Sequence, residues 1–308
     1  MRNFAFIAVF FLWACGVAQD KKEKQSEIVV LSEKIKNDPT NTDLLLARAN
    51  YNKGKNNLES ALFDLSQCVQ LDSLNNAFHF SVAEIYFELS KKTNADRKYP
   101  PLVMHHLDKA LKLNINDEKS HALLGELLLA YAKYKEAIEH FNASLRIEYN
   151  QAKTHMLMGY AFKQLGQEDN AINCFRNAVN VDPEFKEAFV QLGQMFHMKG
   201  DTTAVVYYDN ALQLDPTDEM TLYNKALFYQ SIMKWNAALE AYAALHKVNA
   251  FHSSGHYNIG FIHMELGLYD VAANNFSDAI YGNSEFYEAY YSRGNCFETL
   301  GNIAQAEV

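Results

Sequence analysis

A small residue returns at a nearly constant interval along this chain of 308 residues. Successive members lie 34, 42, 34, 34, 33, 34 and 34 residues apart. The eight positions are Ala49, Ala83, Gly125, Gly159, Gly193, Ala226, Gly260 and Gly294. An interval of this length that contains two amphipathic stretches is typical of a stacked helical solenoid. Such arrays bind other proteins far more often than they catalyse reactions, so the interval constrains both architecture and function.

The unit Ala152–Phe185 shows the pattern within one interval. Its apolar positions lie three or four residues apart, which places them on one face of a helix. They form a first stripe of His155, Met158, Gly159 and Phe162 and a second stripe of Ala171, Phe175 and Ala178. Gly166, between the stripes, favours the left-handed conformation that ends a helix, and Pro183 cannot continue one. The unit is therefore predicted to be helix, short turn, helix, with Gly159 and Ala171 small because the paired helices approach closely.

The same arrangement recurs along the chain. Small residues open the second helix at Ala61, Ala137, Ala171, Ala238, Ala272 and Ala306, and an aromatic residue follows four positions later at Phe141, Phe175, Tyr242 and Phe276. A proline marks the unit boundary at Pro39, Pro183 and Pro216, each time after an aspartate. With this order of residues the chain resembles tetratricopeptide repeat (TPR) proteins from about Thr42 to Val308. The resemblance implies an all-α fold, a right-handed α-α superhelix of about eight helix–turn–helix repeats.

The units begin near Thr42, Asn76, Glu118, Ala152, Lys186, Glu219, Ser253 and Tyr287. A capping helix is expected over residues 26–41, before the array of residues 42–308. The second unit is eight residues longer than the usual 34, and we expect the excess between its helices, around Ser90–Met104, because Pro100 and Pro101 prevent simple helix continuation. The fifth unit is one residue shorter, and we expect a compressed turn at Gly200–Ala204. The last unit is incomplete at Val308, so its apolar face is expected to be covered by further chain, by a partner or by a dimer mate.

Residues 1–14 have the pattern of a signal peptide, with Arg2 before an apolar run that is too short to span a bilayer. The run ends in Leu12, Trp13, Ala14, Cys15 and Gly16, which resembles the lipobox of a bacterial lipoprotein. The resemblance implies that Cys15 is lipidated and becomes the first residue of the mature chain, followed by a polar tether over residues 15–25. Cleavage after Ala18 by the common signal peptidase is the alternative, and both interpretations export the chain. Gly16 after the cysteine favours the outer membrane, with the array facing the periplasm.

Composition limits the partners. The formal net charge is −9, and no stripe of lysine and arginine is present, which argues against nucleic acid as a partner. The cysteines outside the signal region, Cys68, Cys174 and Cys296, lie in different units of a linear stack. They are therefore too far apart for disulfides and are predicted to be small buried hydrophobes.

No arrangement of residues in the sequence points to catalysis. The chain lacks G-x-S-x-G, a phosphate-binding loop and H-E-x-x-H, so we predict no enzyme activity and no cofactor or metal. Four histidines occupy the same place in their repeats, namely His79, His121, His155 and His256. Because no carboxylate or thiol completes a ligand set beside them, a repeated packing position is predicted rather than a metal site.

In TPR arrays the first helix of each unit lines a concave groove, and the resemblance carries this role to the inner positions of this chain. The candidate partner-binding residues are Phe80, Phe87, Met156, Tyr160, Tyr223, Asn224, Leu227, Tyr257, Asn258, Phe261, Met264 and Tyr291. Tyr223, Tyr257 and Tyr291 repeat at 34 residues and are expected to form a ladder along the groove. Two interpretations of this ladder remain open: packing with hydrogen bonds between repeats, or direct contact with a ligand.

These features predict a non-catalytic protein–protein interaction scaffold in the bacterial cell envelope that binds a partner peptide or protein segment in the groove. The inner positions lack the lysines with which TPR co-chaperones grip a carboxylate, so a chaperone-tail clamp is disfavoured. The alternatives are the N-terminal regulatory array of a larger enzyme and a self-associating structural protein, a homodimer through its C-terminal end. The basic segment Ser90–Met104 is either a second surface, for a partner or lipid headgroups, or a tolerated loop expansion.

Overall fold

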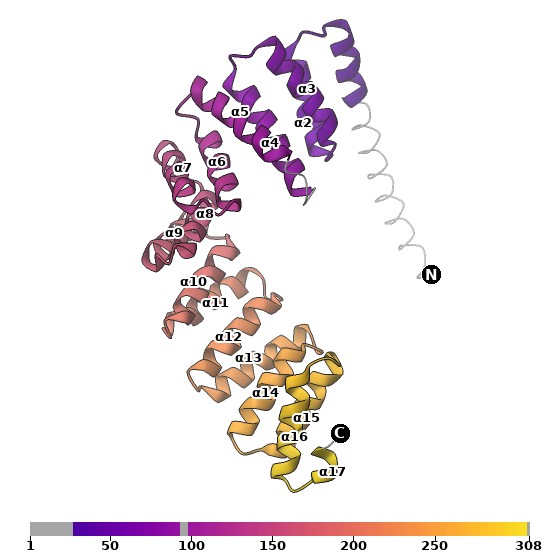
Figure 1. Cartoon of the computed structure of the whole chain (residues 1–308), viewed down its shortest axis with the longest axis vertical. Helices are drawn as coiled ribbons and strands as arrows, with labels where there is room; N and C mark the ends of the chain where they lie inside the picture. The colour runs from indigo at the N-terminus through magenta and orange to yellow at the C-terminus, as the bar shows by residue number, and fades with distance from the viewer. Residues whose placement is uncertain (1–26, 93–97, 307–308) are drawn as a thin grey trace, which may run out of the picture. The chain divides into compact units, whose positions relative to one another are not determined.

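Helices joined by short turns make up the computed structural model, which describes residues 27–92 and 98–306 (Figure 1). The predicted signal peptide, the lipidation site Cys15 and the polar tether lie outside the described residues.

The first of two compact units, Met1–Tyr149, contains a helix over residues 27–37 followed by three helix pairs. The pairs are α2 (Thr42–Gly54) with α3 (Leu58–Leu71), α4 (Asn76–Lys92) with α5 (Tyr99–Leu113), and α6 (Glu118–Ala130) with α7 (Tyr134–Ile147). Ile35 packs in one apolar cluster with Leu45 and Cys68. The helix of residues 27–37 therefore covers the first repeat.

The second unit, Asn150–Val308, contains five further pairs, the last with a second helix of 4 residues. They are α8 (Ala152–Gln164) with α9 (Glu168–Val181), α10 (Lys186–Met198) with α11 (Thr203–Leu214), α12 (Glu219–Ser231) with α13 (Trp235–Val248), α14 (Ser253–Glu265) with α15 (Tyr269–Gly282), and α16 (Tyr287–Thr299) with α17 (Ile303–Ala306). Throughout both units, the first helix of each repeat begins at the residue where the sequence pattern starts a unit. Among the described residues, no helix is long and apolar enough to cross a membrane.

In every repeat but the second, the two helices are joined through a residue in the left-handed backbone region, seven positions after the small residue. Glycine fills this place at Gly166, Gly200, Gly267 and Gly301, with φ of 70°, 65°, 75° and 77°. The sequence-based prediction for Gly166 is confirmed. The same conformation occurs at Asn56, Ala132 and Met233. At Ala132 and Met233 it places Cβ near the following carbonyl oxygen, which costs roughly 1–2 kcal/mol per residue.

A second kind of turn joins one repeat to the next. An aspartate or asparagine after the second helix accepts a hydrogen bond through its side chain from the backbone N–H two residues on. This occurs at Asp72, Asn114, Asp182, Asp215, Asn249 and Asn283, with distances of 3.0–3.1 Å. Pro183 and Pro216 follow such a residue, at a place where the chain turns and their fixed φ is favourable.

The repeated small residue lets an aromatic ring of the second helix lie against the backbone of the first. A Cβ at Gly159 would lie 2.5 Å from a carbon of the Phe175 ring, closer than side chains pack. The other close glycine–ring pairs are Gly125 with Phe141, Gly193 with Tyr208, and Gly260 with Phe276. All four rings are fully buried. The prediction that these positions are small because the helices approach closely is confirmed.

The extra length of the second repeat is mostly helical, so the predicted extra loop at Ser90–Met104 is wrong for most of its length. Ser90–Lys92 continue α4, which has 17 residues against 13 in α2. Tyr99–Met104 belong to α5, whose first turn contains Pro100 and Pro101. Proline is tolerated there because the first N–H groups of a helix have no partner within it.

The fifth repeat is one residue shorter than the usual 34, and the difference lies at the start of α11. Gly200 and Ala204 are four residues apart, whereas Gly166 and Ala171 are five apart. The shortening falls in the helix and not in the turn: α11 has 12 residues, whereas α9 has 14. Consequently the aromatic residue of this repeat is Tyr208, which is absent from the predicted aromatic positions.

The three cysteines in the described residues, Cys68, Cys174 and Cys296, are free and buried, as predicted. Burial raises the pKa of Cys68 to about 11 and that of Cys174 to about 12. Since the thiolate is the reactive form, these residues act as apolar packing groups at neutral pH.

The predicted histidine packing positions hold the turns between repeats. The Nε2 atoms of His79, His121 and His256 lie 3.1, 3.0 and 2.9 Å from the backbone oxygens of Ser73, Ile115 and Ala250. A carbonyl oxygen only accepts, so each Nε2 carries the proton and donates it. In each case the histidine spans six residues back to the loop that precedes its helix.

The Nδ1 atom of the same histidine then carries no proton and can only accept a hydrogen bond, so a second histidine that pairs with it must donate. The Nδ1 of His79 must accept from the Nδ1–H of His106 at 3.1 Å, and His121 pairs in the same way with His140 at 3.0 Å. Burial, with the nearby His79 as a second cause, lowers the pKa of His106 to about 4. Burial likewise lowers the pKa of His140. These second-helix histidines are therefore neutral at pH 7.

Replacing Gly159 with alanine should destabilise the array by about 1–3 kcal/mol, because the new methyl group overlaps the Phe175 ring. Gly54→Ala is the matched control, since no atom lies within 4 Å of a Cβ there. Urea unfolding followed by circular dichroism measures both. Equal midpoints for Gly159→Ala and the wild type would contradict the role of the glycine. The loss should shrink when Phe175→Leu is added, because the two residues share one contact.

Stability should fall as pH drops from about 6.5 to 4. An unfolded histidine with a pKa of about 6.5 binds a proton in this window, whereas folded His106 does not. His106→Asn removes this proton uptake, so its loss of stability between pH 7 and 4.5 should be smaller than that of the wild type by about 1 kcal/mol. The adjacent, exposed His105→Asn is the control. Parallel pH profiles for wild type and His106→Asn would exclude this origin.

Candidate functional site

The twelve residues predicted to line a groove differ widely in exposure. Phe80, Tyr160, Tyr223, Asn224, Leu227, Tyr257, Phe261 and Met264 are half-buried, and Tyr291 is exposed. Phe87, Met156 and Asn258 are only 5%, 4% and 9% exposed. These three side chains pack within the repeats and present little surface to a partner, which corrects the prediction for them.

In the unit Met1–Tyr149, ion pairs cross the inner face. Lys53 Nζ lies 2.5 Å from Glu84 Oε2, and Lys91 Nζ lies 3.4 Å from Glu126 Oε1. Each pair joins the first helices of neighbouring repeats. At these points charged side chains connect the repeats.

In the unit Asn150–Val308, two tyrosines of the predicted ladder take part in packing. The Tyr223 hydroxyl accepts a hydrogen bond from Asn258 Nδ2 at 3.0 Å, across one repeat. The Tyr257 ring lies 5.4 Å from Phe276 and 5.0 Å from Phe286. At these two positions the structure supports the packing interpretation. Replacing either tyrosine would therefore disturb packing as well as any ligand contact.

A pocket of about 490 Å³ opens on the same face between α14 and α16. It is lined by Tyr257, Phe261, Met264, Tyr287, Glu288, Tyr291, Ser292 and Asn295. Four of these residues, Tyr257, Phe261, Met264 and Tyr291, belong to the predicted groove set. The repeat mapping thus placed residues from two different helices at one concave site.

Tyr287, Glu288, Ser292 and Asn295 also line the pocket but are missing from the predicted set. Tyr287 and Glu288 lie outside the positions close to the small residue that the mapping covered, whereas Ser292 occupies the place of Asn224 and Asn258 in their repeats. Tyr287 lies one helical turn before Tyr291, so the continuity of the helix face was the available signal. Tyr287 and Tyr291 are 74% and 73% exposed.

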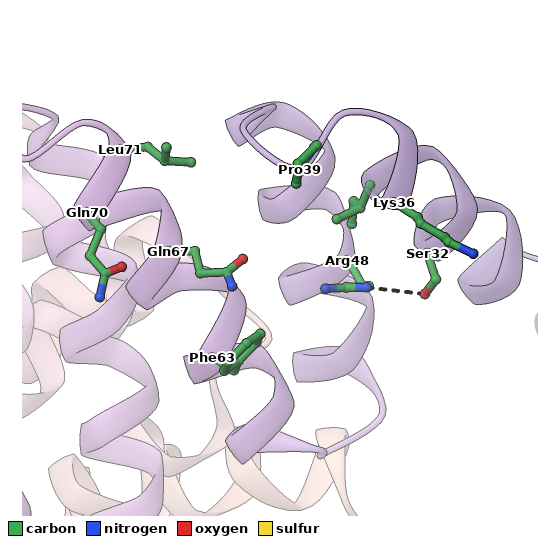
Figure 2. A pocket seen from close by; sticks show the side chains of 9 residues that line it. Ser32, Lys36, Pro39, Arg48, Phe63, Gln67, Gln70 and Leu71 are labelled. Atoms are coloured by element: carbon green, nitrogen blue, oxygen red, sulfur yellow. Dashed lines mark hydrogen bonds between the residues drawn. The ribbon is translucent and has the colours of Figure 1, made fainter.

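A second pocket, of about 460 Å³, lies between the helix of residues 27–37 and α3 (Figure 2). Arg48 Nη1 donates to Ser32 Oγ at 3.3 Å, and its Nε and Nη2 donate to the buried Asp64 at 2.9 and 2.7 Å. The hydrogen bond to Asp64 raises the pKa of Arg48. Arg48 therefore has structural partners and joins the first helix to the first repeat.

A third pocket, of about 520 Å³, lies beside the long second repeat. It is apolar and is lined by Pro100, Pro101, Met104, Leu127, Leu128, Tyr131 and Lys133. The predicted basic surface next to it is distributed over two helices. Lys92 Nζ lies 3.5 Å from the backbone oxygen of Asn56, and Lys98 Nζ lies 5.2 Å from the Tyr99 ring centre. Arg97 lies outside the described residues.

Within residues 27–92 and 98–306, no group of three or more histidine, cysteine, aspartate or glutamate side chains is placed to hold a metal ion.

Comparison with protein families identifies the repeat. Residues 159–200 match the family described as TPR repeat, and residues 257–307 match the tetratricopeptide repeat family. The chain is a TPR protein. The second match contains the pocket between α14 and α16. TPR repeats are typically non-catalytic scaffolds that bind proteins or peptides, which supports the predicted class of function.

Solved structures show the same fold. The C-terminal part of a TPR repeat-containing protein from Cytophaga hutchinsonii is 14% identical, with a TM-score of 0.68, and the match covers 80% of this chain and 98% of that one. YrrB, described as a TPR protein with an unusual peptide-binding site, is 18% identical, with a TM-score of 0.53 and coverage of 61% and 97%. MamA from Desulfovibrio magneticus is 21% identical, with a TM-score of 0.50 and coverage of 57% and 96%. No curated protein sequence matches this chain. The predicted all-α TPR fold is confirmed.

Proposed function

We propose that this TPR protein is a non-catalytic adaptor that holds a segment of another protein in the pocket between α14 and α16. The observation that carries the proposal is the pocket itself, which brings Phe261 and Met264 of α14 together with Tyr287 and Tyr291 of α16. Aromatic and methionine side chains bury a large area on binding and adapt to different partners. A partner segment that covers the two tyrosines would remove this apolar surface from water.

The size of the pocket fits this role. A volume of about 490 Å³ lies in the range of small ligand sites, so the pocket holds one or two side chains and not a folded domain. The partner would therefore insert an extended or helical segment, as peptides do in grooves between helices. YrrB supports the idea that such a fold carries a peptide site, although that description belongs to YrrB alone.

We further propose that the protein acts in the bacterial cell envelope, anchored by lipid on Cys15 and facing the periplasm, with the outer membrane favoured. The support is the sequence of residues 1–18, which has a short apolar run and a lipobox-like end. Several acyl chains on one cysteine would hold the array stably at a membrane, because one chain alone binds only weakly.

Replacing both Tyr287 and Tyr291 with alanine should abolish crosslinking to the partner and change the free energy of unfolding by no more than about 0.5 kcal/mol, because both side chains are exposed. In-cell crosslinking with affinity capture compares the variant with the wild type. The matched control replaces two other exposed tyrosines, Tyr131 and Tyr281, with alanine. The proposal fails if both double variants capture the same proteins as the wild type.

Cys15→Ser should lose metabolic labelling by an alkynyl fatty acid and move from the membrane fraction to the soluble fraction. The wild type should carry the label on its N-terminal peptide, as measured by mass spectrometry. A wild-type chain that begins at Gln19 and carries no label would instead establish cleavage after Ala18.

A further inference from the structure

The chemistry of the pocket between α14 and α16 is that of a site for a cation. Four of its eight lining residues are aromatic, namely Tyr257, Phe261, Tyr287 and Tyr291. The face of an aromatic ring attracts a cation through its quadrupole, and several rings around one site add their attractions. This attraction is strongest when the cation leaves bulk water.

The charge of the pocket has the matching sign. Glu288 is the only charged residue among those that line it. None of the ion pairs found in the described part of the chain includes Glu288. A neutral apolar ligand that covered this carboxylate would take it from water without compensation, whereas a cation would pair with it.

The cation that α16 itself carries is engaged elsewhere. Arg293 Nη1 donates to Ser277 Oγ on α15 at 3.4 Å, and its Cζ lies 5.3 Å from the Tyr290 ring centre. Neither of these partners lines the pocket. The aromatic faces and Glu288 are therefore left without an internal cation.

The neutral polar groups of the pocket suit the same ligand. Ser292, Asn295 and the tyrosine hydroxyls supply oxygen acceptors around the rings. A guanidinium group carries five N–H donors and stacks on aromatic rings, and an ammonium group carries three donors. Arginine fits this combination of flat faces and acceptors best.

We propose that the pocket recognises the cationic side chain of an arginine, or more weakly a lysine, within the partner segment, through its four aromatic residues and Glu288. This inference rests on the proposed function and adds the chemistry of the partner. The bound segment is then basic at one position, which complements a chain with a formal net charge of −9.

The test uses two capped pentapeptides of alanine that differ only at the central residue, arginine in one and citrulline in the other. Citrulline has nearly the same shape as arginine but is uncharged, and a carbonyl oxygen replaces one of its NH2 groups. Methyl-¹³C methionine labelling of the whole protein reports binding at Met264, whose signal is assigned with Met264→Leu. The arginine peptide should shift this signal to saturation and bind about tenfold more tightly than the citrulline peptide.

Two variants distinguish pairing with the Glu288 carboxylate from a general effect of negative charge. Glu288→Gln should weaken the arginine peptide several-fold and leave the citrulline peptide unchanged, because only the first pairs with the carboxylate. Glu265→Gln, at the exposed end of α14, should change neither. Equal affinity for both peptides, no saturable shift with the arginine peptide, or the same loss in both variants would overturn the inference.

These results are independent of the crosslinking experiment. Partner capture that needs Tyr287 and Tyr291, combined with equal binding of both peptides, keeps the adaptor function and removes the preference for a cation. Selective binding of the arginine peptide combined with unchanged partner capture keeps the cation site and removes its role as the partner site.

Discussion

In four of the eight repeats, the contact between a glycine on the first helix and an aromatic ring on the second sets the distance between the two helices. Because a Cβ at Gly260 would lie 2.8 Å from the Phe276 ring, the ring can reach the backbone of α14 only in the absence of a side chain. This contact brings α15 against α14 and places Phe276 where the Tyr257 ring packs on it. The pocket between α14 and α16 therefore depends on the packing contact that supports Tyr257, one of its lining residues.

The first helix of each repeat carries two kinds of position, and their roles differ. The residue four positions before the small residue, such as His256, is directed toward the turn before the helix and holds its backbone. The residue three positions before the small residue lies on the neighbouring face of the helix, as Tyr223, Tyr257 and Tyr291 do. Tyr223 accepts a hydrogen bond from Asn258 of the next repeat and is part of the packing, whereas Tyr257 both packs on Phe276 and lines the pocket between α14 and α16. One register of the repeat therefore contributes both to stability and to the lining of the pocket.

The sequence predicted the repeat starts, the close helix contact and the left-handed turn at Gly166, because each follows from local spacing and backbone sterics. It placed the extra length of the second repeat wrongly, because Pro100 and Pro101 indicate a break but do not show that the break falls at a helix start. The histidine pairs were also beyond prediction, since His79 and His106 are 27 residues apart and meet only through the register of two helices. Burial of Met156 and Asn258 likewise depends on side chains from neighbouring elements. For the groove, the sequence predicted which helix face lines it but not where along that face a pocket lies.

The acidity of the chain and the chemistry of the pocket would act on a basic partner at different ranges. A formal net charge of −9 attracts a cationic segment from a distance, but salt at 0.15 M screens this attraction over about 8 Å. The attraction of the aromatic faces acts within about 6 Å and is screened less, because the rings and the bound cation exclude water from one another. Net charge would therefore govern the rate of encounter and its salt dependence, while the four aromatic residues would govern residence time and the choice of side chain. An acidic array without the pocket would attract basic proteins without discriminating among them, so discrimination has to come from the few residues between α14 and α16.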